Sequence, residues 1–278
     1  MKQARSTLVI EPGYINRRYL RDLWRQRELL LFLGWRDIMV RYKQTAVGMA
    51  WVMIRPLVTM VAFTLVFGKL AGLEARSPGV PYPLLVFSAM LPWQLFADAV
   101  GRISVSLVSN AHIISKVYFP RLIIPLSALF VCLIDFLVAG LILLAMMVIY
   151  HVVPGWQMLA LPLLVLLVGA TALALGLWLA ALSTRYRDLT QLTPLILQFG
   201  LYVSPVGFSS AIVPEQWRWL YGLNPLVGAI EGFRWAILGQ PMLVYWPSVG
   251  VSLALVLLVL LSGLWYLRRI ERSLIDVI

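Results

Sequence analysis

The 278-residue sequence is poor in the residues that carry most protein chemistry. It contains one cysteine, two histidines and 12 acidic residues, and only 13% of its residues are charged. A single cysteine, Cys132, excludes a disulfide within the chain. His112 and His151 are isolated, and no two carboxylates have the spacing of a general acid and base. We therefore expect no metal site and no catalytic site.

The sequence also has no match to the phosphate-binding pattern GxxxxGKS/T, and its longer polar segments are too small to fold as a nucleotide-binding domain. We therefore expect no cofactor on this chain. Its net charge is +11, which in another protein could indicate nucleic acid. Anionic lipids and membrane topology account for this charge without a nucleic-acid partner.

The sequence is rich in apolar residues. Its residues are 61% hydrophobic and its mean hydropathy is +0.87. Six apolar stretches are long enough to cross about 30 Å of hydrocarbon as helices. The predicted spans are residues 47–71, 84–108, 122–150, 159–182, 189–210 and 248–267. The fold class is therefore an all-α polytopic membrane protein, in which a 47–278 transmembrane domain follows a 1–46 leader.

Charge predicts the orientation of these spans. The leader holds ten lysine and arginine residues, and with six spans 18 of the 23 basic residues fall on the leader's side of the membrane. Because basic residues accumulate in the cytoplasm, we expect both termini to be cytoplasmic. The leader is charged and the first span begins near residue 47, so we expect no cleavable signal at the start.

Polar residues divide the spans into two sets. The first, second and fifth spans carry polar groups and many aromatic rings, and we expect them to line a protected interior or a subunit contact. Arg55 lies near the cytoplasmic end of the first span, where it either snorkels or meets a lipid phosphate. Asp98 and Arg102 are four residues apart and are expected to neutralise each other. For Asp135, protonation, a pair with a second copy and a proton relay all remain open.

Three segments outside the spans show their own patterns. Residues 14–28 form an amphipathic pattern typical of a helix on the membrane surface, which is a plain anchor or also contacts a partner. Residues 109–121 predict a cytoplasmic helix of about two turns, capped by Ser109 or Asn110 and ended by Pro120, with a simple turn as the alternative. Residues 214–223 and 225–238 predict two short re-entrant external helices, with Glu231 and Arg234 meeting on one helix face.

Five blocks of the sequence resemble one known family in the same order over nearly the whole chain. The blocks are RYKQTAVGMAWVMIRPLVTMVAFTLVFGKLAG (41–72), YPLLVFSAMLPWQLFADAV (82–100), SLVSNAHIISKVYFPRLIIPLSA (106–128), STRYRDL (183–189) and LNPLVGAIEGFRWAILG (223–239). They look like the membrane subunit of ABC-2-type polysaccharide exporters, which have the type V exporter fold. That family includes permeases for O-antigen, teichoic acid and capsule.

The resemblance implies a mechanism and a set of partners. The permease would be a homodimer in the bacterial inner membrane, working with two copies of an ABC ATPase that binds ATP and Mg²⁺. Its channel would pass a glycan attached to undecaprenyl diphosphate. The interface helix would include Tyr14, Arg17, Arg18, Arg21, Trp24 and Arg25. The ATPase-coupling segment would be residues 109–119, with Ser109, Asn110, His112, Ile113, Ile114, Lys116, Tyr118 and Phe119.

Further residues take roles in this hypothesis. Arg41, Lys43 and Arg55 would receive the lipid diphosphate. The periplasmic gate, residues 214–238, would include Trp217, Trp219, Tyr221, Glu231 and Arg234. Aromatic rings would stack on sugars along the channel, although packing is the alternative for each of them. The candidates are Trp51, Phe63, Phe67, Trp93, Phe96, Phe199, Tyr202 and Phe208.

Two other functions remain open at the level of sequence. An ABC-2 permease for a lipid or drug would share this topology without a channel as wide as a polymer. A membrane enzyme acting on lipid-linked sugars would use the aromatic rings for binding, but it would need clustered carboxylates or histidines that the sequence lacks.

Overall fold

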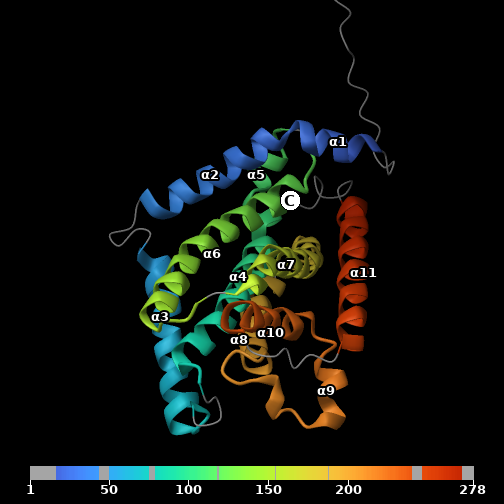
Figure 1. Cartoon of the computed structure of the whole chain (residues 1–278). Helices are drawn as coiled ribbons and strands as arrows, with labels where there is room; N and C mark the ends of the chain where they lie inside the picture. Colours follow the sequence, from blue (N-terminus) through green and yellow to red (C-terminus); the bar gives the residue numbers. More distant parts are fainter. Residues whose placement is uncertain are drawn as a thin grey trace, which may run out of the picture.

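The computed structural model describes residues 17–43, 50–74, 79–117, 119–153, 155–186, 188–239 and 246–270. Within these ranges every element of regular structure is a helix, which confirms the all-α fold class (Figure 1). The α-helices are α1 (Arg17–Arg25), α2 (Arg27–Lys43), α3 (Ala50–Phe63), α4 (Tyr82–Ser109), α5 (Ala111–Ile114), α6 (Ile123–Ile149), α7 (Leu161–Ser183), α8 (Leu189–Val203), α9 (Glu215–Tyr221), α10 (Pro225–Leu238) and α11 (Trp246–Ile270). A π-helix, η1 (Thr64–Leu70), extends α3, and the 3₁₀ turns η3 (Trp156–Ala160) and η4 (Ser210–Ile212) precede α7 and α9.

Five segments in the described part of the chain are long and apolar enough to cross a membrane. They are Ala50–Leu70, Tyr82–Ser109, Ile123–Ile149, Trp156–Ser183 and Gly250–Ile270. They agree with five of the six predicted spans. The chain is a multi-pass membrane protein.

The fifth predicted span is shorter than expected. It was expected to reach residue 210, but α8 has 15 residues and ends at Val203. Its rise of about 22 Å is less than the hydrocarbon thickness of about 30 Å. The helix ends because Ser204 adopts an extended backbone (φ −82°, ψ 149°) and the next residue is Pro205, whose ring disfavours a helical conformation in the residue before it.

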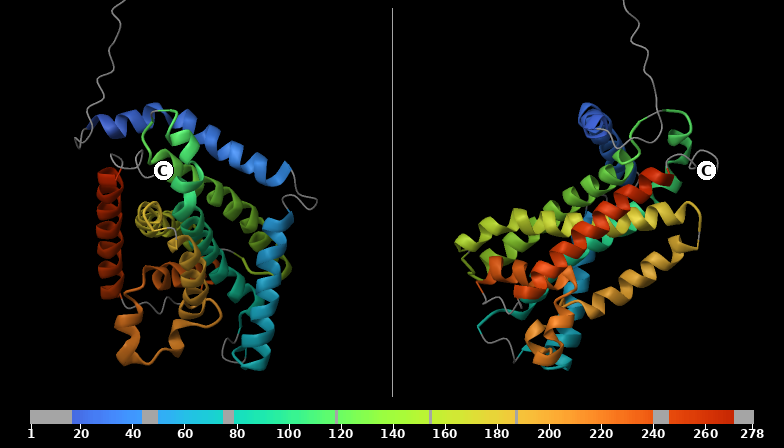
Figure 2. Two further views of the ribbon diagram at one scale, coloured as in Figure 1. Left: turned by 180° about the vertical axis from the view of Figure 1, so that it is seen from behind. Right: turned by 90° about the vertical axis from the view of Figure 1, so that its right-hand side faces the viewer.

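Helix α4 forms the centre of the bundle. Its most apolar stretch is 72% buried, against 33% or less for the other four spanning segments. It packs on α7, α6 and α10, and a glycine permits the closest approach: a Cβ atom at Gly176 of α7 would lie 2.6 Å from Cγ2 of Ile103. Small residues at such contacts let membrane helices approach closely. Helix α8 lies at the edge of the bundle (Figure 2).

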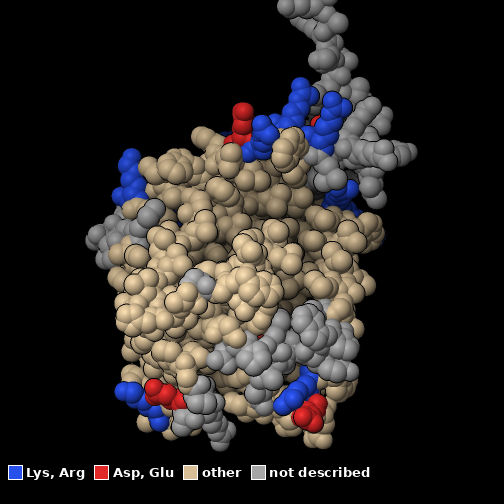
Figure 3. Space-filling model, viewed as in Figure 1, with Lys and Arg blue, Asp and Glu red and all other residues tan. Residues whose placement is uncertain are grey.

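Surface charge on one face of the molecule lies at its two ends. Helices α1 and α5 and the C-terminal end of α11 lie at one end, and α9 lies at the other (Figure 1). On the face drawn in Figure 3, lysine, arginine and acidic side chains gather at these ends, with an uncharged belt between them. Such a belt is the expected outer surface of a protein surrounded by lipid.

The external segment folds as two short helices, close to the predicted ranges. Helix α10 begins at Pro225, where the side chain of Asn224 accepts a hydrogen bond from the Leu226 N–H (3.1 Å). It ends at Gly239, whose positive φ of 65° suits a glycine that closes a helix. Most of α10 is buried against α4 and α7, whereas the large side chains of α9 are exposed.

Candidate functional site: a charged cluster and the coupling segment

Asp135, in the middle of α6, gathers polar side chains from two other helices. Its carboxylate accepts hydrogen bonds from Nη1 of Arg41 (2.7 Å) and the hydroxyl of Tyr42 (2.5 Å) on α2, and from Nη2 of Arg102 (3.1 Å) on α4. The Asp135 side chain is only 11% exposed. A buried carboxylate is costly unless it is paired, and these three donors supply that pairing within one chain.

This arrangement corrects the expected pair of Asp98 with Arg102. Although the two residues are four apart on α4, Arg102 turns to Asp135 on α6, and the nearest cation to Asp98 is Arg55 of α3, at 3.8 Å. Helical spacing alone could not identify these partners, because each lies on a different helix. The partners of Asp135 all lie in its own chain. Asp135 therefore needs no partner from a second copy.

Arg41 and Asp135 of this cluster also line a pocket between α2, α3, α4 and α6. Its cavity volume is small, about 30 Å³, within about 410 Å³ of space that includes open solvent, and its lining includes Arg41, Trp51, Arg55, Asp98 and Asp135. The side chains of Arg55 and Arg41 are 69% and 40% exposed. The lining holds two arginines and two aspartates, and Arg102, which binds Asp135 from outside the lining, adds one positive charge nearby. The exposed guanidinium of Arg55 is the group best placed to bind an anion.

The predicted diphosphate-binding residues are therefore only partly brought together. Arg41 and Arg55 line one pocket, but Lys43 is exposed at the end of α2 and is not part of the lining. Tyr42 was not predicted. Burial and its hydrogen bond to Asp135 raise the pKa of Tyr42 to about 12, so at neutral pH its hydroxyl keeps its proton and donates to the carboxylate.

The predicted channel aromatics separate into exposed and packed rings. Trp51, Phe199 and Tyr202 are exposed, by 56%, 64% and 58%. Trp93 and Phe96 are buried in the bundle, and the Trp93 ring lies close against Gly200 of α8. The expectation that these two rings line a channel is wrong for this structure, since large apolar rings on the central helix fill its core.

The remaining three candidate rings are half-buried. Phe63 and Phe67 pack on each other, with centroids 5.2 Å apart, and both lie close to Gly207. Phe208 is also half-buried. In the single chain these rings contribute to packing, so the exposed rings among the channel candidates lie on α3 and α8.

The predicted coupling segment forms a shorter helix than expected. Helix α4 runs on to Ser109, and α5 has only four residues in place of about two turns. Neither candidate cap acts as one: the Ser109 hydroxyl donates to the carbonyl of Val105, and Asn110 makes no side-chain cap bond. The expected cap is wrong because both side chains bind the end of α4 instead.

The surface of this segment has an inner and an outer side. Ile114 and Phe119 are buried in the core and Ile113 packs against it, whereas His112 and Lys116 are exposed. Tyr118 lies outside the described residues. The exposed side chains, at the same end of the molecule as α1, remain available to a partner.

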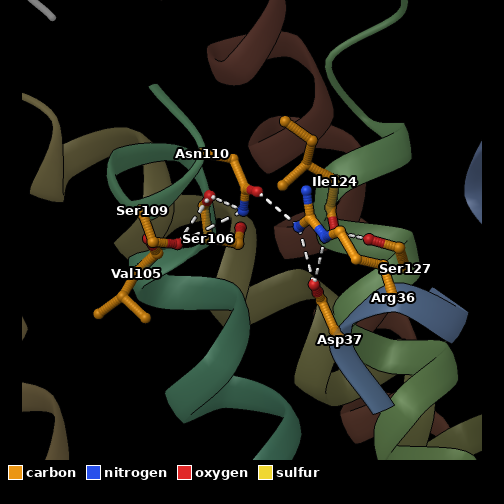
Figure 4. Close-up of polar contacts among 8 residues, drawn as sticks. All are labelled: Arg36, Asp37, Val105, Ser106, Ser109, Asn110, Ile124 and Ser127. Carbon is orange, nitrogen blue, oxygen red and sulfur yellow. Dashed lines mark hydrogen bonds and ion pairs between the residues drawn. The ribbon is translucent and has the colours of Figure 1, made fainter. Parts of the chain in front are cut away.

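Helix α2 contacts the start of this segment. Nη2 of Arg36 donates to Oδ1 of Asn110 (3.0 Å) and to Oδ1 of Asp37 (2.7 Å), as Figure 4 shows. Helix α2 is not among the elements predicted from the sequence. A signal was present: Arg36 and Asp37 interrupt an otherwise apolar run, which indicates a polar partner elsewhere in the fold.

Part of the predicted interface segment forms a helix. Helix α1 covers Arg17–Arg25, and Arg21, Trp24 and Arg25 are exposed, while Tyr14 lies outside the described residues. Nothing is described of the side chains of Arg17 and Arg18. The exposed apolar surface continues along α2, through Leu31, Phe32, Trp35, Met39 and Val40. This surface extends farther than residues 14–28 and suits the lipid interface.

The predicted gate residues also separate into two groups. Trp217 and Trp219 are each 54% exposed, and the hydroxyl of Tyr221 donates to the carbonyl of Val203 at the end of α8. The pair of Glu231 and Arg234 is confirmed, at 3.1 Å, but both side chains are buried.

This buried pair holds the chain between α8 and α9. The Arg234 guanidinium donates to the carbonyls of Val206 and Phe208, and Glu231 accepts from the Ser210 N–H. Glu231 and Arg234 therefore anchor the segment that leads to α9, and they do not form an exposed gate themselves.

Comparison with known proteins identifies the family. The model of the ABC-2 type transporter family matches residues 28–238. The chain belongs to the ABC-2 type transporter family. An O-antigen export system permease protein RfbA of Klebsiella pneumoniae is 29% identical over 210 residues, covering 74% of this chain and 79% of the relative. The protein of the same name in Myxococcus xanthus is 28% identical over 219 residues, covering 78% and 83%.

The ABC-2 match agrees with the geometry of the site. It begins near the start of α2 and ends at the last residue of α10, so it includes the Asp135 cluster, the coupling segment and the buried Glu231–Arg234 pair. Helices α1 and α11 lie outside it. ABC-2 permeases are the membrane subunits of transporters, and the chain is a permease of this kind.

Proposed function

We propose that this permease is the membrane subunit of an ATP-driven exporter for an O-antigen-type glycan linked to undecaprenyl diphosphate. Two copies form the channel in the bacterial inner membrane, and two copies of an ABC ATPase supply the energy. The glycan passes from the cytoplasm to the periplasm, with both termini of the permease in the cytoplasm. The family match and the O-antigen permease relatives support the substrate class.

The pocket between α2 and α4 carries this proposal. Its lining joins two exposed guanidinium groups, those of Arg41 and Arg55, to the ring of Trp51. Guanidinium groups bind phosphate oxygens in a bidentate manner, and an aromatic ring can stack on the face of a sugar. A diphosphate attached to a sugar needs both kinds of contact, and a neutral drug would need no cation.

Exposed aromatic rings on α8 extend this chemistry along the protein. Phe199 and Tyr202 lie three residues apart and are both exposed, so they share one face of the helix. We propose that this face meets the glycan chain in the dimer. No single ring holds the glycan tightly, so the glycan can advance in steps.

Reconstitution tests the proposal. The permease and its ATPase are placed together in vesicles with undecaprenyl-diphosphate-linked O-antigen in the outer leaflet, and glycan that becomes protected in the lumen is measured. We expect ATP-dependent accumulation in those vesicles whose ATPase sites face outward. A matched sample carries an ATPase with its phosphate-binding lysine replaced.

Two results would overturn the proposal. One is equal accumulation with the active and the inactive ATPase. The other is transport of undecaprenyl diphosphate without sugar at the same rate as the glycan-linked form, which would indicate a lipid transporter.

A further inference from the structure

Helix α2 makes two polar contacts with different parts of the protein. Arg41 donates to Asp135 in the lining of the pocket, and Arg36 donates to Asn110 at the start of the coupling segment. The two arginines are five residues apart on one helix, a rise of about 7.5 Å. Helix α2 thus contacts both the pocket and the coupling segment.

The orientation of the Asn110 side-chain amide is fixed by its hydrogen bonds. Nδ2 of Asn110 donates to the carbonyl of Ser106 (2.9 Å), so Oδ1 is left to accept from Arg36. Asp37 in turn fixes the guanidinium, through bonds to Nε (3.0 Å) and Nη2 (2.7 Å). Figure 4 shows the Arg36 guanidinium between Asn110 on one side and Asp37 on the other. Such a network has little freedom to rearrange without moving α2 or the end of α4.

Helix α2 is packed closely against α6. Leu33 and Ile38 are buried, and Gly34 allows contact with α6: a Cβ atom there would lie 2.8 Å from Cδ1 of Phe130. Between Arg36 and Arg41 the helix contains no glycine or proline. The two arginines are therefore joined by an uninterrupted stretch of helix.

We propose that α2 couples occupancy of the pocket to the coupling segment, with Arg36 as the positioning residue at the link. This inference rests on the proposed function, because the ligand is the lipid diphosphate. A phosphate in the pocket competes with Asp135 for Arg41 and so favours a different position of α2. Through Arg36 the change reaches Asn110, where the chain leaves α4 for the segment that faces the ATPase. The ATPase then works faster when substrate is bound.

The test compares ATP hydrolysis with and without substrate in the reconstituted complex of permease and ATPase. The probe is undecaprenyl-diphosphate-linked O-antigen purified from a strain that lacks the permease. For Arg36→Gln we expect the basal rate to remain and the stimulation by this probe to fall at least threefold. Arg36→Lys, which keeps a cation and a donor, should recover part of the stimulation. Arg27→Gln is the matched control, since Arg27 is an exposed arginine on the same helix that lies over the Trp24 ring.

The outcomes separate the two proposals. If the same complex shows no ATP-dependent glycan accumulation in the transport assay, the proposed function fails. If it transports glycan but the probe does not stimulate hydrolysis, the link is wrong and the proposed function stands. If the wild type is stimulated and Arg36→Gln is stimulated equally, the link through α2 is wrong and the proposed function stands. A fall in basal hydrolysis and in thermal stability together, without recovery in Arg36→Lys, would mean that Arg36 is only structural, which also overturns the inference.

Discussion

At the scale of the residue, the arginines of the pocket differ in how firmly they are bound. Arg102 and Arg41 hold hydrogen bonds to Asp135, whereas Arg55 has only a distant carboxylate, at 3.8 Å from Asp98, and a side chain that is 69% exposed. Arg55 is therefore the cation most available to a ligand. It is also the one whose loss should affect the structure least.

We expect Arg55→Gln to slow glycan export about tenfold, equivalent to about 1.4 kcal/mol, because a charge-assisted hydrogen bond to phosphate is lost. Export is measured as surface O-antigen in a permease-deficient strain that carries the variant. The control is Lys69→Gln, which removes an exposed cation from η1 at the other end of the same span. Export at the wild-type rate in Arg55→Gln would remove this residue from substrate binding.

A second residue-scale prediction concerns the buried pair on α10. Glu231→Gln leaves the fully buried Arg234 guanidinium without its carboxylate, and we expect a loss of about 3 kcal/mol in the free energy of unfolding. Thermal unfolding in detergent measures the change. Glu215→Gln breaks an exposed pair with Arg218 on α9 and should leave the midpoint unchanged. Equal shifts in the two variants would contradict the anchoring role of Glu231.

At the scale of the element, the contact of α4 with α7 depends on one glycine. In Gly176→Ala the new Cβ would lie 2.8 Å from Cβ of Ile103, an atom that cannot move without its helix, so we expect a loss of about 1–3 kcal/mol. Gly140→Ala on α6 is the control, because a Cβ there meets no atom within 4 Å. Thermal midpoints of the two variants check the difference. A Gly176→Ala protein as stable as Gly140→Ala would show that the helices have room to separate.

The elements also show how far the sequence could predict this structure. Spans were predictable because hydrocarbon thickness sets their length, and the Glu231–Arg234 pair was predictable because its partners lie on one helix. The partners of Asp98, Arg102 and Asp135 were not, since these contacts join different helices and spacing within one helix carries no information about them. The burial of Trp93 was missed for the same reason: nothing local distinguishes a ring on the central helix from one on an outer helix.

At the scale of the whole molecule, the two charged ends give a test of topology. Cys132, the natural cysteine, is buried, so an introduced cysteine can be labelled with little background. We expect Trp217→Cys on α9 to react with a membrane-impermeant maleimide once the outer membrane alone is permeabilised. His112→Cys should react only after the inner membrane is opened. Labelling of both positions from the same side would contradict the predicted orientation.

The limited length of α8 has a consequence for the surrounding lipid. A helix that rises about 22 Å does not match acyl layers about 30 Å thick, so the bilayer beside it must compress or be kept away by protein. Compression costs less when the fatty acids are short. We therefore expect the permease to be more heat-stable in vesicles of 14-carbon than of 20-carbon phosphatidylcholine, as measured by thermal unfolding.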